Sequence, residues 1–323
     1  MSGRRIAITG LGTFLGRRLV ERFLDTQGGA EPIEIVGIDV RPPLGQGGRM
    51  DVHEVDLAQP TCDAKLADIL TKERVDTVVH LAFRRFPSSD IEYDHDLETL
   101  GSLAVMGACA AANVKRLVVE SSTMVYGAHR DNPNFLSERH PLRGHPDAHN
   151  VQNRIEVEEA LCGWAERYPG IETTVLRHCW VMGPTYFDRT VEFFEHDPVP
   201  TVLGYDPLLQ FIHERDLVDV FERAALESHP GTFNVVGKGV LPLSTLIRSS
   251  GKRAQPVPRS LLYRTAWLAS QRGTGDPPAG FFDYLRYLWV ADGEQGWKEF
   301  GEPIYTSAEA WSAFISARLL RQR

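Results

Sequence analysis

The sequence predicts an α/β fold, in which a doubly wound parallel sheet is followed by a smaller C-terminal lobe. Three observations support this prediction. Runs rich in Val, Ile and Leu alternate with helical segments, a glycine-rich turn follows the first run, and the alternation ends after residue 177. Strands that alternate with helices form parallel sheets with right-handed crossovers, and strands covered on both faces are almost continuously apolar.

The apolar runs of the first half predict strands over residues 4–9, 33–39, 50–56, 76–81, 116–121 and 172–177. Between them, the spacing of apolar residues predicts helices over residues 15–26, 64–71, 94–112 and 151–168. Residues 1–180 therefore form the main part of a predicted dinucleotide-binding domain.

The pattern changes after residue 177. Residues 181–210 are rich in Pro, Phe and Asp, which predicts irregular structure with one short helix. A helix over 213–227 and a strand over 232–236 return to the sheet, so residues 211–240 complete the first domain. Residues 181–210 and 241–323, with apolar helical patches at 260–270 and 308–320, are expected to form the substrate-binding lobe.

Composition narrows the classes of partner. The 35 Lys and Arg against 43 Asp and Glu give a net charge of −8, which argues against binding to nucleic acid or to an anionic membrane. No run of about 18 apolar residues is present, so we expect no membrane span. Cys62, Cys109, Cys162 and Cys179 lack paired spacing, which predicts reduced thiols, no metal site and a cytoplasmic location.

A glycine-rich turn lies between the first predicted strand and the first predicted helix. Glycines let the backbone approach a pyrophosphate, and the new helix presents free N–H groups at the positive end of its dipole. Asp39 closes the next strand, where a carboxylate accepts hydrogen bonds from an adenosine ribose. This pattern predicts a Rossmann-type site. The expected ligands of the dinucleotide here are Gly10, Gly12, Thr13, Phe14, Leu15, Gly16 and Asp39.

The charges beside this site bear on which dinucleotide is bound. Asp39 would repel a 2′-phosphate, so the sequence favours NAD over NADP. Arg41 could pair with such a phosphate, which keeps NADP as the alternative.

Seven segments bear on the family: TGLGTFLG (9–16), DL (56–57), VHLA (79–82), ESSTMVYG (120–127), VLR (175–177), VMGP (181–184) and QFIHERDL (210–217). In this order they resemble the extended short-chain dehydrogenase/reductase superfamily, and within it the NAD-dependent epimerase/dehydratase group. The resemblance implies a Rossmann sheet with a C-terminal substrate lobe. It further implies that cofactor and substrate meet at the carboxyl ends of the strands.

The resemblance also implies roles for particular residues. It places Asp56 and Leu57 beside the adenine, Leu81 and Ala82 along the cofactor, and Ser122 against a substrate oxygen. In the family, the helices after the fourth and fifth strands often form a dimer interface. Small residues at helical spacing in the segment 94–112 favour such a homodimer, with close packing inside one chain as the alternative: Gly101, Ala104, Ala108, Ala111 and Ala112.

Two motifs depart from the family pattern. Thr13 replaces the middle glycine of the turn, where it would either crowd the pyrophosphate or donate a hydrogen bond to it. Asn150 and Arg154 align with the family's Tyr-x-x-x-Lys pair, in which the phenol exchanges a proton with substrate and the lysine holds the ribose. An amide does not titrate near neutrality, so Asn150 cannot replace the phenol. Arg154 can still bind the ribose.

Three explanations remain for the missing tyrosine. Another residue takes the proton, with His149 as the first candidate and His178, Tyr126 and Tyr186 as others. Alternatively, the chain is a non-catalytic NAD(P)-binding sensor or scaffold. In the third explanation, the alignment of Asn150 and Arg154 with the Tyr-x-x-x-Lys pair is wrong and another tyrosine fills the place, although no tyrosine occurs between Tyr126 and Tyr168.

We therefore expect an NAD(P)-dependent oxidoreductase or epimerase-like enzyme with a degenerate site formed by Ser122, His149, Asn150 and Arg154. Aromatic residues near Trp180 favour a carbonyl or hydroxyl substrate with an apolar body over a nucleotide sugar: Phe83, Phe86, Phe187, Phe193 and Phe194. On the helix that carries Arg154, one solvated face is expected to hold Glu156, Glu158 and Glu159.

Overall fold

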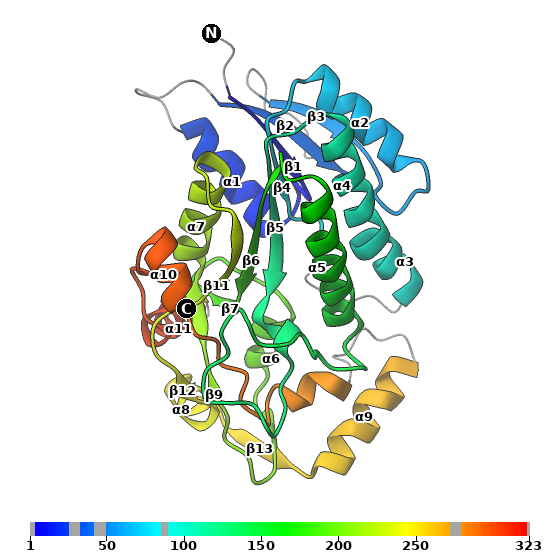
Figure 1. Cartoon of the computed structure of the whole chain (residues 1–323). Helices are drawn as coiled ribbons and strands as arrows, with labels where there is room; N and C mark the ends of the chain where they lie inside the picture. The colour runs from blue at the N-terminus through cyan, green and yellow to red at the C-terminus, as the bar shows by residue number, and fades with distance from the viewer. Residues whose placement is uncertain (1–3, 26–32, 42–49, 85–89, 272–278, 322–323) are drawn as a thin grey trace.

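The computed structural model describes residues 4–25, 33–41, 50–84, 90–271 and 279–321. Within these residues, seven parallel strands form the central sheet in the order β11-β6-β5-β4-β1-β2-β3 (Figure 1). The strands are β1 (Arg4–Thr9), β2 (Ile33–Asp39), β3 (Met50–Glu54), β4 (Thr77–His80), β5 (Arg116–Ser122), β6 (Glu172–His178) and β11 (Gly231–Val235). Their carboxyl ends therefore meet at one edge of the sheet.

Helices cover both faces of this sheet. Figure 1 shows α1 (Phe14–Asp25) and α7 (Glu214–Leu226) on one face, and α2 (Cys62–Lys72), α4 (Gly101–Ala111) and α5 (His149–Arg167) on the other. Each layer buries its own apolar core against the sheet. The fold is thus the predicted doubly wound α/β sheet.

The remaining elements lie mostly at the carboxyl edge. Three strand pairs join them: β7 (Trp180–Met182) with β10 (Phe211–His213), β8 (Val199–Val202) with β13 (Ala254–Val257), and β9 (Leu208–Leu209) with β12 (Leu241–Pro242). The helices are α6 (Arg189–Glu195), α8 (Leu243–Ser249), α9 (Arg259–Gln271), α10 (Glu294–Phe300) and α11 (Ser307–Arg321). The division into 1–180 with 211–240 and 181–210 with 241–323 stays a prediction.

One expectation about these elements was confirmed and one was wrong. The helix expected over 94–112 runs without a break through α3 (Ile91–His95), a π-helical turn (Asp96–Leu100) and α4. The segment 181–210 contains short strands besides the predicted helix, because these strands are specified by distant partners rather than by a local pattern. Thr26, the last residue of the first predicted helix, lies outside the described residues.

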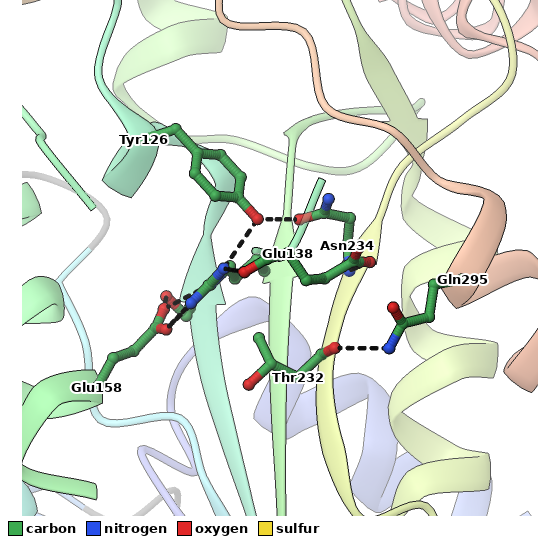
Figure 2. Close-up of polar contacts among 8 residues, drawn as sticks. Tyr126, Glu138, Glu158, Thr232, Asn234 and Gln295 are labelled. Carbon is green, nitrogen blue, oxygen red and sulfur yellow. Dashed lines mark hydrogen bonds and ion pairs between the residues drawn. The ribbon is translucent and has the colours of Figure 1, made fainter. Parts of the chain in front are cut away.

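A buried polar network ties the sheet to its surroundings (Figure 2). The guanidinium of Arg177 donates to both carboxylate oxygens of Glu158, at 2.5 to 3.1 Å, and to the Tyr126 hydroxyl at 2.8 Å. The Tyr126 hydroxyl donates in turn to Oδ1 of Asn234 at 2.7 Å. Glu158 was expected on a solvated face, but its side chain is 6% exposed because α5 turns it toward β6. Only Glu156 and Glu159 of that group face solvent.

Two further findings concern the whole chain. Within the described ranges, none of the helices combines the length and the apolar character needed to cross a membrane. All four cysteines have free thiols, and Cys162 is the exposed one. The cytoplasmic location predicted from them stays a prediction.

Candidate functional site

The turn after β1 needs glycine at two positions. Gly10 has φ +70°, and a Cβ there would lie 2.5 Å from the carbonyl oxygen of Leu81. A Cβ on Gly16 would lie 2.6 Å from the carbonyl oxygen of Gly10. Both contacts are too short for any side chain, so β1, β4 and α1 pack directly against this turn. Leu81 is buried beneath it.

Thr13 caps the helix that begins at the turn. Its hydroxyl oxygen accepts the N–H of Gly16 at 3.1 Å, and its own N–H donates to the carbonyl oxygen of Gly10 at 2.9 Å. A threonine at this position satisfies one of the free N–H groups of α1. The hydroxyl keeps its own proton, which is available to donate to an anion at the turn.

Asp39 lies across the turn from α1. Its carboxylate accepts the N–H of Gly12 at 2.7 Å and the N–H of Arg41 at 3.1 Å. Beside it is a cavity of about 430 Å³ lined by Gly10, Gly12, Thr13, Ile38, Asp39, Val40, Arg41, Val55, Leu57, Ala82, Phe83, Arg84 and Leu97. The structure therefore brings most of the predicted adenosine-side residues together.

Three residues predicted to contact the cofactor line neither this cavity nor the neighbouring one described below. The Asp56 carboxylate accepts the N–H of Ala58 at 3.0 Å and shapes the turn after β3, so only Leu57 of that pair faces the cavity. Leu81 and Gly16 lie in the packing beneath the turn.

A second cavity of about 110 Å³ continues from the first at the carboxyl edge. The two cavities share Thr13, Phe83 and Arg84, so they form two ends of one cleft. The lining of this second end includes Phe14, Leu15, Ser122, Asn150 and Arg154, all predicted from the sequence. His149 is exposed at the first residue of α5 and does not line this end.

Arg154 brings a buried positive charge to the cleft. The side chain donates to the carbonyl oxygen of Asn150 at 3.0 Å, and its guanidinium carbon lies 4.8 Å from the ring centre of Phe83. The residue is 9% exposed, and its Nε has no hydrogen-bond partner within the described chain. An unused buried donor at this point fits a ribose hydroxyl.

The carboxylate of Glu98, which interacts electrostatically with Arg154, is fully buried. Glu98 accepts the side-chain amide of Asn153 at 2.9 Å and the N–H of Arg84 at 2.7 Å. Burial raises the pKa of Glu98, while the charge of Arg154 opposes that shift. These contacts fix the helix that carries Arg154.

Ser122 ends β5 with its side chain in the cleft. Its hydroxyl oxygen accepts the N–H of Met124 at 3.2 Å and caps the turn Thr123–Tyr126. The hydroxyl proton is therefore available to a ligand in the cleft. The contact with a substrate oxygen stays a prediction.

Tyr126 does not reach the cleft. Its hydroxyl is held by Arg177 and Asn234 in the network described above, and burial raises the pKa of Tyr126 to about 12. Tyr186 does line the cleft, where its ring packs against Phe14 at 5.0 Å.

The sequence analysis missed Glu120 and treated His178 as a minor candidate. Both line the cleft, and His178 Nε2 lies 3.1 Å from Oε1 of Glu120. Alternation along β5 could have found Glu120, because it lies two residues before Ser122 on the same face of the strand.

The aromatic wall of the cleft is partly as predicted. Trp180 and Phe83 line it, together with Phe281, whose ring stacks on Trp180 at 5.7 Å. Phe193 and Phe194 are buried but do not line the cleft, and Phe187 is 41% exposed. Phe86 lies outside the described residues. Within those residues, no group of three or more His, Cys, Asp or Glu side chains could hold a metal ion.

Comparison with known proteins gives relatives along the whole chain. An uncharacterized protein of Mycobacterium tuberculosis is 29% identical over 97% of this chain and 84% of its own length. The UDP-glucose 4-epimerase of Lactobacillus helveticus is 31% identical over 36% of this chain and 35% of its own.

Solved structures share the fold at low sequence identity. MoeE5, in complex with UDP-glucuronic acid and NAD, has a TM-score of 0.74 and 20% identity over 98% of this chain and 99% of its own. WbmG of Bordetella bronchiseptica, in complex with NAD and UDP, has a TM-score of 0.73 and 19% identity over 99% of this chain and 95% of its own. The family model described as "NAD dependent epimerase/dehydratase family" matches residues 6–236. The chain belongs to the NAD dependent epimerase/dehydratase family.

Proposed function

We propose that this protein is an NAD-dependent oxidoreductase or epimerase-like enzyme that acts on a carbonyl or hydroxyl compound. The observation that carries the proposal is the single cleft that runs from Asp39, past the glycine turn, to Ser122 and Arg154. Membership of the family supports NAD as the cofactor, as does the binding of NAD by the solved neighbours.

The residues of the cleft fit a dinucleotide without a 2′-phosphate. The cavity lined by Gly10, Gly12 and Thr13 has room for a pyrophosphate at the positive end of α1, and the Thr13 hydroxyl can donate to it. The Asp39 carboxylate accepts ribose hydroxyls and disfavours a phosphate, although Arg41 lines the same cavity. Arg154 would hold the second ribose through its guanidinium, which lines the cleft.

NAD bound in this way supplies hydride exchange with a carbinol or carbonyl carbon. Ser122 would orient the substrate oxygen, and the walls made by Phe83, Trp180 and Phe281 would hold an apolar body. The solved neighbours bind UDP, UDP-glucose or UDP-glucuronic acid, so nucleotide sugars belong in any substrate screen.

Two measurements on the purified protein test this function. Titration with NADH and NADPH, followed by nucleotide fluorescence, should saturate with NADH at the lower concentration; no saturation with either would refute the proposal. The NAD-loaded protein, mixed with UDP-glucose or with cyclohexanol, should gain absorbance at 340 nm. Saturable NADH binding without reduction by any alcohol in a wider screen would favour the alternative, a non-catalytic NAD(P)-binding sensor or scaffold.

The expected homodimer is also proposed here. The continuous helical segment made of α3, the π-helical turn and α4 exposes three large apolar side chains, which are Ile91, Leu100 and Leu103. Sedimentation equilibrium should give twice the mass of 36.2 kDa, and Leu103→Glu should give the monomer. A monomeric parent protein would show that the small residues serve packing within one chain.

A further inference from the structure

The cleft contains a histidine–carboxylate pair, and the family's tyrosine is absent from position 150. We propose that His178, held by Glu120, is the catalytic acid–base group that exchanges a proton with the substrate oxygen. This inference rests on the proposed function, because it assigns a proton donor to the same site.

The sheet places this pair beside the serine that would orient the substrate. In the register of β5 and β6, the Cα of Ser122 lies opposite that of His178, and Glu120 lies two residues earlier on the same face of β5. All three side chains line the cavity. The side chains of His178 and Glu120 are 13% and 16% exposed, so the pair reaches the cleft but is largely shielded from bulk water.

The hydrogen bonds of His178 define where protons must lie. Nδ1 is 2.8 Å from the carbonyl oxygen of Cys179, which can only accept, so Nδ1 carries a hydrogen. Nε2 is 3.1 Å from Oε1 of Glu120, and an ionised carboxylate also only accepts. The contact is favourable only if one further proton lies between Nε2 and Oε1. The pair therefore stores a proton at the wall of the cleft.

Apart from Tyr186, the other titratable or charged groups facing this end of the cleft have structural partners or the wrong chemistry. Arg84 lies 3.0 Å from Asp94, Arg189 lies 2.7 Å from Glu192, and Asp188 accepts the N–H of Val191. An arginine such as Arg154 stays charged and cannot join a proton relay. His149 does not line the cavity. Tyr186 lines it with its ring on Phe14, so its phenol is the alternative proton donor at this end of the cleft.

The proposed step balances in both directions. In reduction, a ketone carbon receives hydride from the dihydronicotinamide of NADH while the ketone oxygen takes the proton held between Nε2 and Oε1. The C=O π bond is replaced by one C–H and one O–H bond, giving an alcohol and NAD. In oxidation, the alcohol returns its proton to Nε2 as hydride leaves its carbon. Ser122 donates a hydrogen bond to the same oxygen in either direction.

The stored proton can be observed without turnover. In protein labelled with ¹⁵N-histidine, both ring nitrogens of His178 should show the chemical shifts of N–H nitrogens at neutral pH. In Glu120→Gln the side-chain amide donates to Nε2 instead, so Nε2 should move to the shift of an unprotonated nitrogen while Nδ1 is unchanged. An unprotonated Nε2 in the parent, unaltered by Glu120→Gln, would overturn the inference.

The chain offers a matched control. His95 and Glu156 form the same kind of pair at the same distance of 3.1 Å, but they are 41% and 49% exposed and neither lines the cleft. Glu156→Gln should leave the spectrum of His178 unaltered, and His95→Gln should leave the rate of ketone reduction unaltered.

Kinetics then test whether the proton is used. The NADH-loaded protein is mixed with cyclohexanone, and loss of absorbance at 340 nm is followed in a single turnover. His178→Gln should slow this step by about 10²- to 10⁴-fold and bind NADH within about twofold of the parent. Glu120→Gln should slow this single-turnover reduction less than His178→Gln does, and it should alter the pH profile of the reduction rate.

The outcomes separate the two proposals. A retained rate in His178→Gln, or a loss confined to His149→Ala, would overturn the role of His178 and leave the proposed function standing. Absence of NADH binding in the parent protein would refute the proposed function and, with it, this inference. If NADH binds but cyclohexanone is not reduced, the nitrogen shifts decide whether the pair holds the proton.

Discussion

The ion pair between Arg177 and Glu158 should be one of the most costly single contacts to break. The side chains are 7% and 6% exposed, and the guanidinium also donates to the Tyr126 hydroxyl and to the carbonyl oxygen of Glu138. Burial opposes the charge on Arg177, but the hydrogen bonds and charge of Glu158 outweigh it and raise the pKa of the guanidinium. Arg177→Met would leave a buried carboxylate whose remaining hydrogen bond comes from Ser121.

Loss of one partner of a buried pair costs about 3–5 kcal/mol, whereas replacing both with apolar residues is often nearly neutral. We therefore expect Arg177→Met to lower the free energy of unfolding in urea by about 3–5 kcal/mol, and Arg177→Met with Glu158→Met to recover most of it. The control is Arg18→Met, whose partner Glu21 is 52% exposed and whose loss should cost under about 1 kcal/mol. Equal effects of Arg177→Met and Arg18→Met would refute this reasoning.

Three further predictions concern the sheet and the turn. Burial lowers the pKa of His80 to about 3, so below about pH 6.5 the unfolded chain binds a proton that the folded chain excludes. The free energy of unfolding should therefore fall by about 1.4 kcal/mol for each unit by which the pH is lowered from about 6.5 to about 3. Urea unfolding of His80→Gln should lack this pH dependence, and the same dependence in both proteins would contradict the prediction. Gly16→Ala should weaken NADH binding at least about tenfold, because the added methyl group forces the turn open. Gly163→Ala, a control with open space around it, should bind NADH like the parent. Equal NADH affinities of the two variants would show that close packing at Gly16 does not matter for binding. Asp39→Ser should favour NADPH over NADH by at least about tenfold relative to the parent in fluorescence titrations, and an unchanged ratio would remove Asp39 from the ribose site.

The sheet was predictable because its signal is local. Runs such as IEIVGID of β2 and RLVVESS of β5 are rich in Val, Ile and Leu, and the alternation with helices leaves little choice of topology. The glycine turn was predictable for a similar reason, since close approach of backbone segments restricts Gly10 and Gly16 to glycine.

The wrong or incomplete predictions depend on contacts between distant residues. Glu158 looks solvated beside Glu156 and Glu159, and it is buried because Arg177, on another element, supplies its counter-charge. His149 was predicted from its place beside Asn150 along the chain, but it does not line the cleft, whereas His178, at the end of β6, does. Pairing of Glu120 with His178 requires the register of β5 and β6, which no single segment specifies.

We propose that one cleft holds NAD with its nicotinamide end at Ser122 and His178. A crystal structure of the protein grown with NADH tests it most directly. We expect the pyrophosphate at the start of α1, the adenosine ribose on Asp39, and the nicotinamide beside Ser122. Dinucleotide density elsewhere, or an empty cleft at a saturating concentration of NADH, would contradict the account.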